Sequence, residues 1–284
     1  MNPTPTEPLV PPPPSVAVPA GSKPYPGALP PMDYLLLCGD LLDLPRITTA
    51  VAQIYMHRCN RHLAREAERH GTAGRSTTDL DVYLMTSACL HLACKSTETL
   101  RKVRDMVNVG NLVLHAKQPY LNLDDRYQRL RDSLVTAELM VLRILRFDVN
   151  AQPPHVWVAR IIRRTLEPER YADIYDDDGD TLSDDGEEGA VRASDTRTDT
   201  NASVSHPMAR TFAQLAWVHA NDSMRSEKLA LDYAPRVLAL ASVYMASHAL
   251  DIPLPQPFET WCTLWGEPNA GQIKAAVLDL AAIY

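Results

Sequence analysis

The sequence predicts an all-α protein, and three observations lead to this prediction. Apolar residues recur every three or four positions through most of the chain, which is the period of an amphipathic helix. Alternating apolar and polar residues, the pattern of a half-buried strand, do not occur. Glycine is scarce, at 11 of 284 residues, against a usual level of about 7%. A turn-rich β protein is therefore not expected.

The first half of the chain carries five expected helices. They span Met32–Leu42, Arg46–Arg69, Leu80–Lys95, Thr99–His115 and Asp124–Arg146. The second of these places apolar side chains at spacings of three and four, so that they share one face. Asp79 can cap the third helix. Asp124 and Asp125 suit the start of the fifth, because carboxylates are stabilised at the positive end of a helix dipole.

The second half carries five more expected helices. They span His155–Leu166, His206–Met224, Tyr233–Leu250, Phe258–Leu264 and Ala270–Tyr284. Pro153 and Pro154 introduce the first of them, because proline is tolerated in the first turn of a helix. Five helices before Asn150 and five after Gln152 indicate two copies of one helical module. We therefore expect domains at residues 32–150 and 151–284.

Residues 1–31 form a proline-rich leader, with 12 of the chain's 23 prolines. Pro11–Pro14 favours the extended polyproline II form, which buries nothing by itself. We expect a disordered tail, although such a segment could also dock into an aromatic groove of another protein. Thr4, which precedes Pro5, is a candidate site for a proline-directed kinase.

Residues 173–205 form an acidic insertion with few large apolar side chains, and we expect it to be disordered. Within it, residues 173–203 hold 11 acidic residues against Arg192 and Arg197, a local charge of −9. The whole chain carries −7, so the remainder sums to only +2. Ser183, followed by Asp184 and Asp185, is a candidate site for an acid-directed kinase; the alternative is an unmodified, solubilising loop.

Cysteine usage and hydropathy predict an intracellular protein, nuclear or cytoplasmic. The five cysteines are odd in number and never spaced as C-x-x-C, which favours reduced thiols. The longest uncharged apolar run, Val237–Leu250, has 14 residues, whereas a membrane span needs about 20. The first residues lack the basic start of a signal peptide. No membrane association is expected.

Motifs of catalysis and metal binding are missing from the sequence. It contains no G-x-S-x-G, H-E-x-x-H or G-x-x-x-x-G-K-[ST]. His57 and His62 diverge on their helix, and Cys59 with His62 would supply only two ligands, which is a poor metal site. We therefore expect no metal, no cofactor and no catalytic residue. An all-α enzyme would need a cleft with converging polar groups, which the sequence does not indicate.

The same helix carries a stripe of arginines at positions 58, 61, 65 and 69. It could receive phosphate or an acidic peptide. We favour a solvated face instead, because Glu66 and Glu68 dilute its charge.

Two apolar helices carry a charged residue at an unusual position. The segment Leu92–Glu98 ends one of them abruptly in Lys95. The segment Ala137–Asp148 belongs to the other, whose apolar seam carries one carboxylate, Glu138, near Leu134, Val141 and Leu142. A carboxylate in apolar surroundings is costly unless it finds a partner. The pair could simply tie two helices together. Alternatively, it offers a donor and an acceptor side by side, able to grip the main chain of another protein.

These residues resemble the cyclin family. Its pattern is L-A-x-K-x-x-E on the third helix and a glutamate before V-L-x-x-L-x-F-D on the fifth. The family's architecture is two five-helix cyclin boxes. Leu100–Val109, Leu130–Leu134 and Leu142–Phe147 look most like cyclin Q, and cyclin L is the second choice. The family often has two acids after the lysine; here Thr97 takes the place of the first.

The resemblance implies a non-enzymatic subunit that binds and activates a cyclin-dependent kinase, most like cyclin-dependent kinase 10. Lys95, Glu138 and Glu98 would bind the kinase segment that leads into its αC helix and hold that helix in its active position. A role linked to transcription is implied as well.

The alternative is a nucleic-acid-binding protein with tandem cyclin boxes, like general transcription factor IIB. It would have a strongly basic body and a zinc ribbon. The body sums to only +2 and Cys38 is the sole cysteine before Cys59, so direct nucleic-acid binding is not expected.

Overall fold

The computed structural model describes residues 29–69, 81–115, 121, 124–166, 206–254, 257–266 and 269–284. Every regular element in these residues is an α-helix, which confirms the predicted fold class. The candidate phosphorylation sites Thr4 and Ser183 lie outside the described residues, as do nearly all of the proline-rich leader and the whole acidic insertion. None of the helices described is long and apolar enough to cross a membrane.

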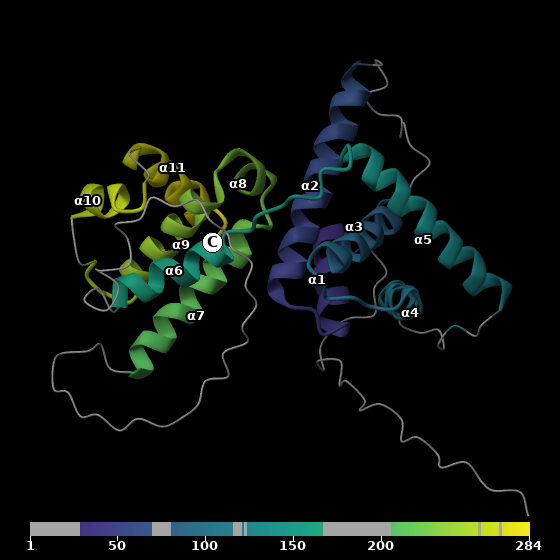
Figure 1. The fold of residues 1–284 in the computed structure, drawn as a ribbon, viewed down its shortest axis with the longest axis horizontal. Coiled ribbons are helices and arrows are strands. Elements are labelled where there is room, and N and C mark those ends of the chain that lie inside the picture. The colour runs from purple at the N-terminus through teal and green to yellow at the C-terminus, as the bar shows by residue number, and fades with distance from the viewer. Residues whose placement is uncertain are drawn as a thin grey trace, which may run out of the picture.

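The N-terminal unit is built around a central helix. Its helices are α1 (Pro31–Leu41), α2 (Arg46–Arg69), α3 (Val82–Ser96), α4 (Val103–Leu114) and α5 (Asp125–Ile144). α3 packs against α1, α2, α4 and α5 (Figure 1). Between Met85 and Cys94 every α3 residue except Ser87 is buried, as expected of a helix that is apolar on nearly all sides. The residues of α3 therefore become exposed only near its two ends, where the helix reaches the surface.

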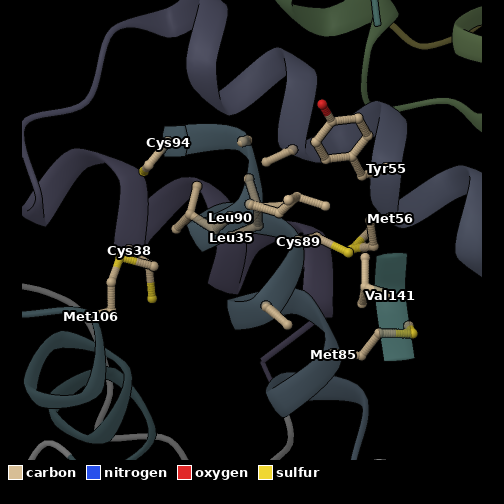
Figure 2. Close-up of a cluster of buried hydrophobic side chains, with 14 of the residues drawn as sticks. Leu35, Cys38, Tyr55, Met56, Met85, Cys89, Leu90, Cys94, Met106 and Val141 are labelled. Atoms are coloured by element: carbon tan, nitrogen blue, oxygen red, sulfur yellow. The ribbon is translucent and has the colours of Figure 1, made fainter. Parts of the chain in front are cut away.

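Sulfur-containing side chains make up much of this unit's core. Figure 2 shows Cys38, Met56, Cys89 and Cys94 around leucines of α1 and α3. All five cysteines of the chain are free and buried, in agreement with the prediction of reduced thiols. Burial raises the pKa of Cys38 to about 12, so this thiol stays protonated and behaves as a small apolar group.

Three predicted helix ends are wrong by a few residues. α3 begins at Val82, and Asp81 caps it by accepting the Tyr83 N–H at 3.1 Å, whereas Asp79 lies outside the described residues. α4 begins at Val103 rather than residue 99, because Glu98 adopts a φ of 57° that reverses the chain. α5 ends at Ile144, because the residues at 146 and 147 also have positive φ. These turns are stabilised by tertiary packing, so the helical periodicity of the sequence does not predict them.

The C-terminal unit is also built around one helix. It contains α6 (His155–Leu166), α7 (His206–Ser223), α8 (Glu227–Asp232), α9 (Pro235–Ala249), α10 (Phe258–Thr263) and α11 (Ala270–Ala281). α9 packs against α6, α7 and α11 (Figure 1). Six helices are thus described where five were expected. The missed element, α8, has only six residues, too few for a periodic pattern.

A third apolar cluster joins the two units. Ala50 and Ile54 of α2 contact Met224, Leu229 and Leu238 from the C-terminal unit. Next to it, His57 Nε2 donates a hydrogen bond of 2.9 Å to the Met224 carbonyl. His57 and Cys59, considered above as metal ligands, thus belong to the packed interior. Of the described helices of the C-terminal unit, the short helix α8 has the most extensive contact with α2.

The arginine stripe on α2 is only partly a solvated face. Arg61 donates to Glu227 at 2.8 Å and to Asp232 at 2.7 Å, at the two ends of α8. These carboxylates raise the pKa of the Arg61 guanidinium. The stripe was expected to face solvent, and the structure corrects this at Arg61, which bridges the two units.

Candidate functional site

Lys95 and Glu138 are in direct contact. Lys95 lies in the last turn of α3, Glu138 lies beyond the middle of α5, and the two helices pack together. The Lys95 ammonium donates to Glu138 Oε1 at 2.5 Å. The expectation that these residues lie side by side between the third and fifth helices is confirmed.

The two side chains differ in exposure. The Lys95 side chain is 47% exposed and the Glu138 side chain only 8%. Both were expected on an exposed face, and for Glu138 this is wrong. Its carboxylate lies at the edge of the core, because Leu134, Ala137 and Val141 on the same helix face are buried.

His91 is the third member of this group, and the sequence did not predict it. Its Nδ1 lies 3.0 Å from Glu138 Oε2. Burial lowers the pKa of His91, and the Lys95 charge acts in the same direction, although Glu138 opposes them. The neutral ring then donates its Nδ1–H to the carboxylate. The sequence did contain an indication of this role: His91 and Lys95 are four residues apart and so share a face of α3.

An apolar surface adjoins the pair. Val135 and Leu139 project from α5, and the Leu139 side chain is 52% exposed. With 100° of rotation per residue, the two lie on the side of α5 that continues from Glu138 away from the core. Exposed apolar groups next to a positioned charge pair are typical of interaction surfaces. We call Lys95, Glu138, Val135 and Leu139 the Lys95–Glu138 surface.

Phe147, shortly after the end of α5, is a further exposed apolar residue, at 68%. It has a φ of 62°, directly after Arg146 at 55°, an outlying conformation for a bulky residue. The Phe147 N–H donates to the Leu142 carbonyl at 2.8 Å, which closes the end of α5. Backbone strain at an exposed aromatic residue is commonly associated with function.

Buried Tyr55 of α2 fixes the chain that follows Phe147. Its hydroxyl donates to the Val149 carbonyl at 2.6 Å, and the Tyr55 hydroxyl oxygen lies 2.9 Å from Ser96 Oγ. Figure 2 shows the Tyr55 ring at the edge of the core with its hydroxyl pointing away from it. One side chain therefore contacts both the end of α3 and the segment after α5, close in the chain to Lys95 and Phe147.

Glu98 stands apart from the pair. It follows α3, has a φ of 57° and is exposed. Within the described part of the chain its carboxylate makes no ion pair with Lys95. Thr97, which takes the place of a second acid, instead hydrogen-bonds Thr48 at 2.9 Å and Thr99 at 3.0 Å. The turn is thus held by hydroxyl groups rather than by charge.

The arrangement is suited to binding rather than to bond chemistry. A lysine ammonium has three donors, and only one of them is given to Glu138. Together the pair can donate to a main-chain carbonyl and accept from a main-chain N–H, while the apolar residues pack beside them. No group of three or more metal-binding side chains occurs among the described residues.

Comparison with known protein families and sequences supports the cyclin family. Residues 31–150 match the family model for the N-terminal domain of cyclins. Cyclin-L2 of Mus musculus is 26% identical over 256 residues, which cover 87% of this chain and 39% of the relative. Cyclin-L1 of Homo sapiens is 27% identical over 257 residues, covering 89% and 38%. The chain spans about two fifths of the length of these relatives.

The relatives fit the second choice of subgroup made from the sequence. These relatives are cyclins L, the subgroup placed second from the sequence. The first choice, cyclin Q, is not shown by them.

Two solved structures share the fold. A chain of the yeast RNA Pol II CTD kinase CTDK-1 complex has a TM-score of 0.58 at 17% identity, covering 89% of this chain and 64% of its own. A chain of the CAK complex from Chaetomium thermophilum, bound to ATP-gamma-S, has a TM-score of 0.54 at 14% identity, covering 89% and 61%. At these identities the likeness concerns the fold alone.

Proposed function

We propose that this chain is a regulatory cyclin subunit that binds a cyclin-dependent kinase and activates it, without catalysing a reaction itself. One observation carries the proposal: the paired Lys95 and Glu138 side chains sit beside exposed apolar residues on a cyclin-like N-terminal unit. The two helical units correspond to two cyclin boxes, at residues 32–150 and 151–284.

The Lys95–Glu138 surface would bind the kinase segment that leads into the αC helix. Lys95 donates to a backbone carbonyl, Glu138 accepts a backbone N–H, and Leu139 and Phe147 pack on apolar kinase residues. Glu98 would add a contact at the end of α3. A protein kinase is active only when its β3 lysine pairs with a glutamate on αC. A surface that contacts only the helix-in arrangement favours that state by its differential affinity.

The binding free energy available from this surface is large enough to shift a kinase to its active state. Moving a kinase from 1% to 99% active requires about 5.5 kcal/mol of differential binding. A hydrogen bond to a charged group contributes about 1.5–3 kcal/mol, and burying one large apolar side chain contributes about 1.5–3 kcal/mol. Two anchors and two apolar contacts therefore exceed the requirement before the cost of association is subtracted.

The proposed kinase partner is one linked to transcription. The similar cyclins L and a neighbour from an RNA Pol II CTD kinase complex support this choice. A partner like cyclin-dependent kinase 10, and with it a nuclear or cytoplasmic location, follows from the resemblance to cyclin Q. We propose these finer assignments on that resemblance alone.

Co-purification tests the proposal. The full chain carrying Lys95→Ala with Glu138→Gln should fail to bring down a kinase from the native cell. The matched control is Lys274→Ala with Glu259→Gln, which breaks another lysine–glutamate pair of 3.1 Å, between α10 and α11. Circular dichroism of each variant checks the fold. Undiminished kinase recovery by the first variant would contradict the proposal.

A further inference from the structure

The C-terminal unit carries a cluster of arginines stacked on tryptophans. Two guanidinium groups lie over the Trp157 ring of α6: that of Arg236 on α9, 4.3 Å from the ring centroid, and that of Arg160, 5.2 Å from it. Arg164 stacks on Trp265 at 5.4 Å. Arg236 also donates to the Trp265 carbonyl at 2.9 Å. We call these five residues, together with the exposed Arg163 of α6, the Arg–Trp surface. Its two main elements, α6 and α9, pack side by side (Figure 1).

The carboxylates of this unit are mostly engaged elsewhere. Those with partners are Glu227 and Asp232 with Arg61, Asp279 with Lys228, Glu259 with Lys274, and Asp222 with Tyr284. In contrast, Arg160, Arg163 and Arg236 make no ion pair with any residue that the structure describes. Arg160 and Arg163 are exposed. The unit thus presents an excess of positive charge at α6.

Stabilisation of helices does not account for this arrangement. Arg163 and Arg164 lie in the last turn of α6, where cations are favoured by the helix dipole. Arg236, however, lies in the first turn of α9, where the dipole disfavours a cation. Stacking on Trp157 orients it there. Arginines on aromatic faces are weakly hydrated and keep N–H groups for carboxylates, so that they favour acidic ligands.

We propose that the Arg–Trp surface is a docking site for the acidic segment 173–205 of the same chain. The charges are complementary, with 11 acidic residues and two arginines within residues 173–203. The chain leaves α6 at Leu166, two residues after Arg164, and re-enters the described structure in α7, which packs on α6. This proposal does not depend on kinase binding.

The connection also fits in length. Asp173 is seven positions after Leu166 in the sequence, which limits the distance between them to about 25 Å. The 12-residue helix α6 is about 18 Å long, so the acidic segment can reach every arginine on it. A ligand tethered by a short chain has an effective concentration of about 1 mM. Even a weak site is then occupied by its own chain.

Competition with a free peptide tests the proposal. The probe is a labelled synthetic peptide of residues 173–205, titrated at low salt onto two full-length proteins. One is the natural chain; in the other, the 11 acidic residues are replaced by Asn or Gln. If the tethered segment occupies the surface, the neutralised chain should bind the probe about tenfold more tightly, since the internal competitor is gone.

Charge-matched variants locate the site. In the neutralised chain, Arg160→Gln with Arg163→Gln should abolish probe binding. The control, Arg104→Gln with Arg129→Gln, removes two exposed arginines of the N-terminal unit and should leave it intact. If the double variant fails to fold, Arg160→Lys takes its place as the test. This variant keeps the charge but loses the planar guanidinium, and it should weaken probe binding.

Three outcomes would overturn the proposal. Equal probe binding by the natural and neutralised chains would mean that the surface is open to an acidic segment of another protein. Absence of probe binding to the neutralised chain would mean that the surface does not take acidic segments. Equal losses in the Arg160/Arg163 and Arg104/Arg129 variants would mean that only overall charge matters.

Discussion

The imidazole of His91 and the carboxylate of Glu138 form a buried hydrogen bond of 3.0 Å between α3 and α5. Because Lys95 occupies the other carboxylate oxygen, Glu138 is held from two sides by one helix. Its orientation is thus set before any partner arrives. Such preorganisation lowers the entropy lost on binding.

His91 is therefore predicted to position Glu138. His91→Leu removes the donor to a buried carboxylate, which should lower the free energy of unfolding by about 1–3 kcal/mol and weaken kinase binding about tenfold or more. Affinity measurement with purified kinase and denaturant unfolding check both effects. His91→Asn keeps an N–H near the Nδ1 position and should restore most of the affinity. If Asn and Leu behave alike in binding, His91 only fills space.

Lys95 and Glu138 should differ in their effects on stability. Lys95→Ala should change the free energy of unfolding by less than about 1 kcal/mol, because the lysine is about half exposed and Glu138 keeps its hydrogen bond from His91. Glu138→Ala leaves the buried His91 donor without a partner and should cost about 1–3 kcal/mol. Both variants should lose kinase binding. Denaturant titration and a pull-down separate the two readouts, and a larger stability loss in Lys95→Ala would contradict the geometry.

Phe147 should lower the stability of the fold through its backbone conformation and strengthen kinase binding through its ring. The left-handed backbone costs an L-residue about 1–2 kcal/mol, so Phe147→Gly should raise the free energy of unfolding by up to about 1 kcal/mol after the greater freedom of unfolded glycine is counted. The same variant loses the exposed ring and should bind the kinase less tightly. Phe147→Ala is the control, since it loses the ring and keeps the strain. Equal melting temperatures of the Gly and Ala variants would contradict this account.

The short helix α8 should be required for the joint between the two units. Leu229 of α8 is fully buried against Ala50 and Ile54 of α2. Leu229→Ala should lower the free energy of unfolding by about 2–5 kcal/mol, as for other buried leucines. Leu264→Ala, at an exposed leucine of the same unit, should stay within about 0.5 kcal/mol. Chemical unfolding of the full chain measures the free energy of unfolding of both variants. Similar decreases in the two would contradict the prediction.

Stability should fall in mild acid. Burial lowers the pKa of His57, His91, His155 and His219 below the ordinary value of 6.5. Between the lowered values and 6.5 the unfolded chain binds more protons than the folded one, so stability rises with pH through this window and is lost as pH falls. Each histidine contributes a slope of at most about 1.4 kcal/mol per pH unit.

Denaturant unfolding between about pH 7.5 and about pH 5.5 measures this dependence. His155→Asn should reduce the slope, because its ring nitrogen bonds only to Asn221 and the variant no longer titrates. His248→Asn, at an exposed position, is the control. A free energy of unfolding that rises toward pH 5.5 would contradict the prediction.

Sequence periodicity predicted most helices but not their ends. The ten expected helices all have counterparts, since apolar stripes at a period of 3.6 reflect burial on one face. α8 was missed because its six residues bury mainly Leu229. The ends of α4 and α5 were misplaced because Glu98, Arg146 and Phe147 have positive φ. Nothing in these residue types favours that conformation, which tertiary contacts such as that of Tyr55 with Val149 hold in place.

The helical class and the near-neutral body follow from the sequence alone, because periodicity and composition are local properties of the chain. The sequence also indicated that Glu138, a carboxylate on an apolar stripe, needs a partner, and the resemblance to cyclins pointed to Lys95. The tertiary structure was needed to show that His91 shares the carboxylate, that Phe147 is exposed, and that Arg160 and Arg236 both stack on Trp157. These relationships join residues of different helices or depend on a strained turn, so their distances and exposure are set by packing.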